Sequence, residues 1–209
     1  MILAIESSTP RASLALYDRE TSAVVWSREF VSERAHNAMI FEPLEEGLER
    51  CRRQLDLIII GRGPGSYGGV RVGIAVANGL SVALGAPVIG LSSLEALSAD
   101  VATYAVIGDA RRQSFFVARI REGALEAEPD LVTQQGLIDD LTLLDRSGIP
   151  VFTSDPALAA AHPGITHAVP DAALLARRAA TFDPDSVARL ASEPLEPHYL
   201  RAPYITTPK

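Results

Sequence analysis

Residues 55–84 read LDLIIIGRGPGSYGGVRVGIAVANGLSVAL, and this stretch decides how the chain folds. It opens with the apolar run 57–60, which is rich in β-branched residues and typical of a buried strand. Five glycines follow within the nine positions 61–69, and glycine lets the main chain approach another group closely. Residues 70–84 are apolar almost throughout and have the length of a helix. A strand, a glycine loop and a helix in this order can present backbone N–H groups to an anion.

The glycine loop has two possible roles. Gly63, Gly65 and Gly68 match the spacing of a dinucleotide-binding loop, but the acidic residue expected roughly 20 positions later is missing, since Glu95 comes too late. An ATPase P-loop needs a lysine after its last glycine, and the only lysine of this chain is Lys209. The sequence therefore leaves open whether the loop is an anion cradle or a tight structural turn.

The helix expected at residues 70–84 is apolar on every side. One side carries Val70, Ile74, Ala77, Ser81 and Leu84, and another carries Val72, Val76, Leu80 and Ala83. A helix that is apolar all round is usually buried all round. We infer that one face packs on the chain's own sheet and the other meets a second protein; the alternative is a helix buried within one subunit. It is shorter than the about 20 apolar residues that span a bilayer, so we expect no membrane contact.

Composition narrows the class of protein. The 209 residues are enough for one large or two small domains, and 47% hydrophobic with 22% charged residues is typical of a globular protein. A net charge of −7 argues against a strong nucleic-acid binder acting alone. The single cysteine, Cys51, excludes an internal disulfide and a cysteine-cluster metal site. The N-terminal residues do not resemble a signal peptide, and we expect a cytoplasmic protein.

The order of elements predicts an α/β fold with two related domains. Strands at 2–5, 12–17 and 23–30 precede a helix at 36–53, in which Pro43 should cause a kink or a shortening. The strand at 57–60, the helix at 70–84, a strand at 88–91 and a short helix near residue 95 complete a β-β-β-α-β-α-β-α unit. A second unit opens with a hairpin at 104–120. We therefore expect one domain at 1–102 and a smaller one at 103–209, whose C-terminal tail packs back on the first.

Three motifs resemble the TsaB (YeaZ) family: residues 6–9 (ESST), 61–74 (GRGPGSYGGVRVGI) and 196–201 (EPHYLR). Asp109, Ala110 and Arg111 also resemble the family pattern. The resemblance implies an actin/hexokinase-like (ASKHA, ribonuclease H-like) fold with mixed sheets flanked by helices. It also implies a non-catalytic dimerisation subunit, a paralogue and partner of TsaD. TsaD transfers a threonylcarbamoyl group from threonylcarbamoyl-adenylate to the adenosine next to the tRNA anticodon.

Under this resemblance the partner is a TsaD-like catalytic subunit, joined by a TsaE-like ATPase, while the chain alone forms a homodimer and meets tRNA only through the complex. The two N-terminal-domain helices would form the interface. The residues expected there are Met39, Gly69, Val70, Gly73, Ile74, Ala77, Leu80 and Ser81. We accordingly expect Ala77→Arg or Leu80→Arg to leave the fold largely intact and to block association.

Catalytic and metal-binding residues are not expected. A TsaD-like metal site needs two histidines four residues apart on the first helix, and this chain has His36 but Ile40. This fold family binds nucleotide phosphates in its hairpin turns, so the candidate nucleotide-binding residues are Ser7, Ser8, Thr9 and Arg111. No cofactor is required by the subunit itself, although ATP or ADP could occupy the complex. The alternatives are an ATP-dependent phosphotransferase or ATPase of the same fold, and a metallopeptidase.

Overall fold

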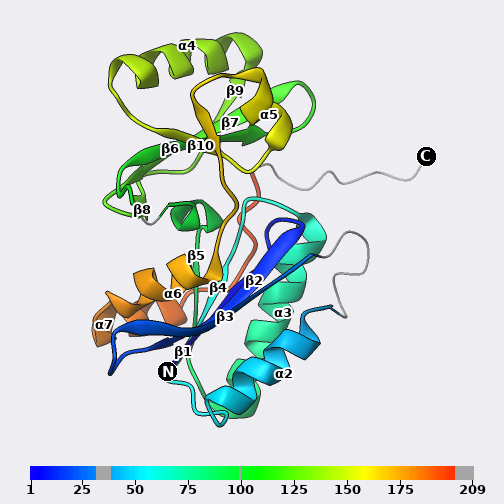
Figure 1. Cartoon of the computed structure of the whole chain (residues 1–209), viewed down its shortest axis with the longest axis vertical. Coiled ribbons are helices and arrows are strands. Elements are labelled where there is room, and N and C mark those ends of the chain that lie inside the picture. Colours follow the sequence, from blue (N-terminus) through cyan, green and yellow to red (C-terminus); the bar gives the residue numbers. More distant parts are fainter. Residues whose placement is uncertain (32–38, 99, 201–209) are drawn as a thin grey trace, which may run out of the picture.

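The computed structural model describes residues 1–31, 39–98 and 100–200, and it has two halves, each built on a mixed sheet (Figure 1). The first sheet has the order β3-β2-β1-β4-β5. Its strands are β1 (Ile2–Glu6), β2 (Arg11–Asp18), β3 (Ala23–Val31), β4 (Leu57–Gly61) and β5 (Val88–Leu91). The hairpins β1–β2 and β2–β3 are antiparallel, while β4 runs parallel to both β1 and β5.

Alternation along the strands builds a core on each side of the first sheet. Leu3, Ile5, Ile58 and Ile60 face helices α2 (Phe41–Arg50) and α3 (Tyr67–Leu84). Their neighbours Ile2, Ala4, Leu57 and Ile59 face the opposite side, toward α6 (Ala172–Ala180). This period of two is that of a sheet covered on both faces.

The second sheet has the order β11-β10-β6-β7-β8, with β9 paired to β7. Its strands are β6 (Tyr104–Asp109), β7 (Ser114–Arg121), β8 (Ala124–Leu125), β9 (Asp130–Thr133), β10 (Val151–Thr153) and β11 (Ile165–His167). Helices α4 (Gln134–Arg146) and α5 (Pro156–Ala161) cover one face, and the linker helix η1 (Ser93–Ala96) adjoins the other. As in the first sheet, an antiparallel hairpin is followed by a strand parallel to its first member. The two halves are therefore related units, as expected.

The C-terminal part of the chain returns to the first half of the molecule. The second sheet does begin near residue 103, but α6 packs on β1 and β2 of the first sheet, and α7 (Pro184–Ala191) contacts β5. The backbone N–H of Ala172 donates to the Ser13 hydroxyl at 2.9 Å, which fixes the start of α6 there. The chain therefore leaves the first half after β5, builds the second half, and returns before its C-terminus.

The N-terminal-domain helices differ from expectation at their starts. Helix α2 begins at Phe41, so Pro43 lies in its first turn, where proline is tolerated. His36 lies outside the described residues. Helix α3 begins at Tyr67, three residues before the expected start, because the Ser66 hydroxyl accepts a hydrogen bond from the N–H of Gly69 and caps it. It ends at Leu84, and the following Gly85 has a φ of 70°, the left-handed conformation common after a helix.

Candidate functional site

The glycine loop packs against the residues that follow β1. A Cβ atom at Gly65 would lie 2.1 Å from the Ser8 carbonyl oxygen, and one at Gly69 would lie 2.1 Å from that of Ser7, so neither position has room for a side chain. The N–H groups of the loop are also used internally: Gly63 donates to the Ser93 hydroxyl at 3.0 Å and Ser66 to the Ser8 carbonyl at 2.6 Å. The glycines therefore serve a tight structural turn, and these N–H groups are not presented to an anion.

Two of the predicted nucleotide-binding residues are closed off by this packing. Ser7 and Ser8 are buried, and the Ser7 hydroxyl donates to the Gly69 carbonyl at 2.9 Å. Thr9 is half-buried and donates to the Arg11 carbonyl at 2.7 Å. Arg111 is exposed in the β6–β7 turn, beside Asp109. Ser7 and Ser8 are therefore closed off from solvent beneath the glycine loop, and a role for them in nucleotide binding stays a prediction.

Glu6 lies beneath the same loop. Its carboxylate is fully buried: Oε1 accepts a hydrogen bond from the Ser8 N–H at 2.6 Å, and Oε2 lacks a hydrogen-bond partner among the described residues. Burial raises the pKa of Glu6, and hydrogen bonds from Ser8 and Ser93 offset this only in part. A carboxylate that positions a metal–nucleotide complex has to be reachable from the bound nucleotide, and Glu6 is buried beneath the loop.

Two surface hollows lie elsewhere, in the second half. One of about 540 Å³ runs between α4 and the loop containing His162, and one of about 400 Å³ lies between α4 and β7. The residues that line them include none of Ser7, Ser8, Thr9 and Arg111. These hollows are therefore not the nucleotide site that the sequence predicted.

Helix α3 has an inner face that carries five of the residues predicted to meet the partner. Five of the expected interface residues are buried within the chain, packed toward the first sheet: Gly69, Val70, Gly73, Ile74 and Ala77. A Cβ at Gly73 would lie 2.4 Å from the Ser7 hydroxyl, so the helix and sheet touch there. The expectation that Ala77→Arg spares the fold is therefore wrong, because Ala77 is 0% exposed. Leu80 and Ser81 lie at the edge, and Ser81 donates to the Ala86 carbonyl at 2.7 Å.

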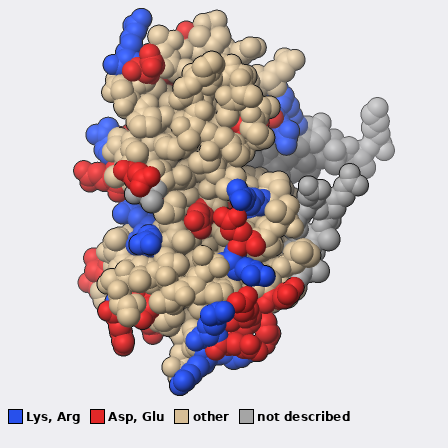
Figure 2. Space-filling model, in the orientation of Figure 1, with Lys and Arg blue, Asp and Glu red and all other residues tan. Residues whose placement is uncertain are grey.

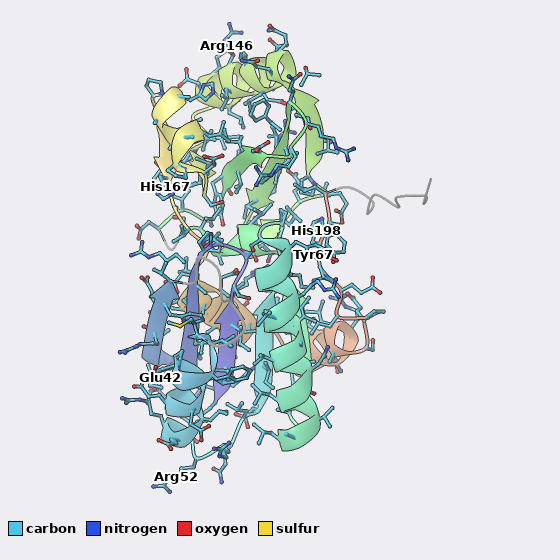
Figure 3. All side chains as sticks on the ribbon, turned by 90° about the vertical axis from the view of Figure 1, so that its right-hand side faces the viewer. Glu42, Arg52, Tyr67, Arg146, His167 and His198 are labelled. Atoms are coloured by element: carbon cyan, nitrogen blue, oxygen red, sulfur yellow. The ribbon has the colours of Figure 1, made fainter. Side chains whose placement is uncertain are left out.

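The outer face of α3 is uncovered and nearly uncharged. Its exposed residues are Tyr67, Gly68, Arg71, Ala75, Asn78, Gly79, Val82 and Ala83. Figure 3 shows α3 on the outside of the molecule, next to α2. By length and composition this helix alone, among the described residues, could cross a membrane, yet only 28% of it is buried. Val82 is 88% exposed, and on the α2 side Met39 and Phe41 are also exposed. We call the surface formed by the exposed residues of α3 the outer α3 face.

A signal for the outer face was present in the sequence. The only charged residue of α3 is Arg71, and Asn78 lies seven positions later, which is nearly two turns. A charged residue and an amide on the same side of a largely apolar helix mark the side turned away from the core. Counting apolar residues missed this, because the core-facing residues are apolar too.

Known proteins of similar sequence belong to one pathway of tRNA modification or are uncharacterized. Residues 30–134, half of the chain, match the family model of TsaD, tRNA N6-adenosine threonylcarbamoyltransferase. An uncharacterized protein of Mycobacterium tuberculosis is 31% identical over 78% of both chains. The tRNA threonylcarbamoyladenosine biosynthesis protein TsaB of Bacillus subtilis is 31% identical over 72% of this chain and 69% of its own.

The chain belongs to the TsaB family. The resemblance of its three motifs to TsaB is thereby confirmed. Among solved structures, an uncharacterized Pseudomonas aeruginosa protein with similarity to the peptidase YeaZ superposes with a TM-score of 0.74. That comparison covers 96% of this chain and 99% of the other at 24% identity, so it confirms the predicted two-unit α/β fold and carries no statement about activity.

Proposed function

We propose that this TsaB-family chain is a non-catalytic subunit of a complex that makes threonylcarbamoyladenosine in tRNA, and that it binds a TsaD-type catalytic subunit through the outer α3 face. The observation that carries the proposal is an apolar 18-residue helix left largely uncovered in the isolated chain. Covering this helix would stabilise a complex by roughly 25 cal/mol for each Å² of apolar surface removed from water. Membership in the TsaB family supports a TsaD-type protein as the partner in this proposal.

The site geometry supports a role without chemistry of its own. Ser7 and Ser8 are buried, and Glu6 is held away from solvent under the glycine loop. The catalytic step in this proposal belongs to the TsaD-type partner, and the chain needs no cofactor. We further propose that a TsaE-type ATPase joins the pair, that the chain forms a homodimer through the same face when alone, and that tRNA is reached in the cytoplasm through the complex.

Reconstitution tests the proposal. The purified chain is mixed with a TsaD-type protein, a TsaE-type ATPase, threonylcarbamoyl-adenylate and unmodified tRNA, and the modified nucleoside is measured by mass spectrometry. We expect product only when both the chain and the TsaD-type protein are present. Val82→Arg should abolish the gain, whereas an exposed control on the second half, Leu143→Arg, should not. Modification by the chain alone, or magnesium-dependent ADP release from it, would contradict the proposal.

A further inference from the structure

Two exposed tyrosines stack on each other at the start of α3. Tyr67, on the first turn of the helix, and Tyr199, near the C-terminus, have ring centroids 5.7 Å apart and planes inclined by 27°. Both are well exposed, at 61% and 43% respectively. The Arg71 guanidinium lies 5.1 Å from the centre of the Tyr67 ring, and its Nη1 contacts the Tyr67 hydroxyl. We call Tyr67, Arg71 and Tyr199 the aromatic cluster.

The chain segment that carries Tyr199 is fastened on both sides of that residue. Leu195 packs against the first core, and the His198 N–H donates to the Arg62 carbonyl of the glycine loop at 2.8 Å. The His198 ring contacts Glu128 of the second half, and Leu200 packs into that half's core. Figure 3 shows His198 beside Tyr67, where the two halves meet. The tail therefore crosses the junction and holds Tyr199 at a fixed place on the surface.

These contacts stabilise the chain, but they do not explain why the rings face outward. Leu200, the next residue, is partly buried against the core of the second half, whereas Tyr199 is exposed and stacks on another exposed ring. Tyrosine and arginine are the residues most enriched at energetically dominant positions of protein interfaces. Rings that are already held in place lose little side-chain freedom on binding, which favours affinity.

The aromatic cluster is continuous with the outer α3 face. Tyr67 and Arg71 belong to the exposed stripe that continues through Ala75 and Gly79. The small residues of this stripe allow another helix to approach closely, while the cluster projects large side chains at one end. Arg71 is the single charge on the helix, so a complementary partner offers a carboxylate there and apolar groups elsewhere.

We propose that the aromatic cluster is the anchor by which the outer α3 face binds its TsaD-type partner, and that the C-terminal segment 195–200 is folded across the junction to build that anchor. The partner places an apolar or planar side chain against the stacked rings and a carboxylate beside Arg71. This inference rests on the proposed function and adds which residues dominate the affinity. It also gives the tail motif a role in binding as well as in joining the two halves.

The test measures affinity for the purified TsaD-type protein by titration calorimetry. Tyr67→Ala and Tyr199→Ala should each weaken binding by about 10- to 100-fold. The double variant should lose less than the product of the two single losses, because the rings act as a pair. Tyr199→Phe keeps the stack and should bind nearly as well as the wild type. Leu143→Ala, an exposed apolar residue on α4, is the control and should change nothing.

The possible outcomes distinguish a failure of the anchor from a failure of the proposed function. If the wild-type chain does not bind the TsaD-type protein, both fall. If the wild type binds, Val82→Arg abolishes binding, and both alanine variants bind as the wild type does, the anchor is wrong and the proposed function stands. If the alanine variants keep their protein affinity but reduce crosslinking of tRNA to the assembled complex, the cluster is an RNA contact and the anchor is again wrong. Equal thermal midpoints for all variants ensure that folding is not the cause.

Discussion

The two sides of helix α3 have nearly the same chemistry and opposite surroundings. Val70, Ile74 and Ala77 lie against the first sheet, whereas Ala75, Gly79 and Val82 are exposed. Apolar character alone therefore does not tell which side is covered within the chain. The inner face is distinguished by close approach, since Gly69 and Gly73 touch Ser7. The outer face is distinguished by open space, since a Cβ atom added at Gly68 or Gly79 would meet no other part of the protein within 4 Å.

Ala77→Arg and Val82→Arg place the same charge on the two sides of α3, and only the first should lower the stability of the chain. Ala77 is fully buried, so an arginine there lacks both room and a counter-charge and should destabilise the chain by about 4 kcal/mol or more. Val82→Arg should change the free energy of unfolding by no more than about 0.5 kcal/mol, as is usual for exposed positions. Urea unfolding followed by circular dichroism measures both. Equal stability of the two variants would refute the assignment of the faces.

Glycine-to-alanine changes sharpen the same comparison with a single added methyl group. A Cβ at Gly69 would meet the Ser7 backbone at 2.1 Å, so Gly69→Ala should destabilise the chain by about 1–3 kcal/mol. A Cβ at Gly79 meets nothing within 4 Å, so Gly79→Ala should stabilise the helix by about 0.5–1 kcal/mol. Thermal midpoints should therefore move in opposite directions, and a rise for Gly69→Ala would show that the loop is not tightly packed on β1.

Glu6→Gln tests the burial of the Glu6 carboxylate beneath the glycine loop. Burial raises the pKa of Glu6 above its ordinary value of 4.5, so the folded state binds this proton more tightly than the unfolded state does. The associated stability is present below pH 4.5 and is lost as the pH rises through the raised folded-state value. Glutamine has no such dependence and can donate toward the Ser93 hydroxyl. We expect the variant to gain stability over the wild type as the pH rises above 4.5.

Urea midpoints at several pH values measure this gain. Ser93→Ala, combined with either residue at position 6, controls for the loss of the neighbouring hydroxyl. A difference between Glu6→Gln and wild type that stays constant with pH would mean that the carboxylate titrates as an exposed group does.

The fold could largely be predicted from the sequence because its strands and helices carry clear periods. The hairpin at 104–120 lies where the sequence predicted it. Strand β11 was missed because Ile165–His167 is too short to carry a pattern. The sheet on which α6 packs could not be predicted either, because an alanine-rich helix packs equally well on either sheet. Five of the residues predicted to meet the partner share an apolar face that packs on the first sheet, and apolar character alone could not separate that core face from a partner face.

The most direct test of the account is sedimentation of the wild type and of Val82→Arg with an equimolar TsaD-type protein. The account predicts a stable complex for the wild type, and two separate, folded species for Val82→Arg with an unchanged unfolding midpoint. A Val82→Arg chain that still binds as tightly as the wild type would contradict the claim that the outer face of α3 is where this protein meets its partner.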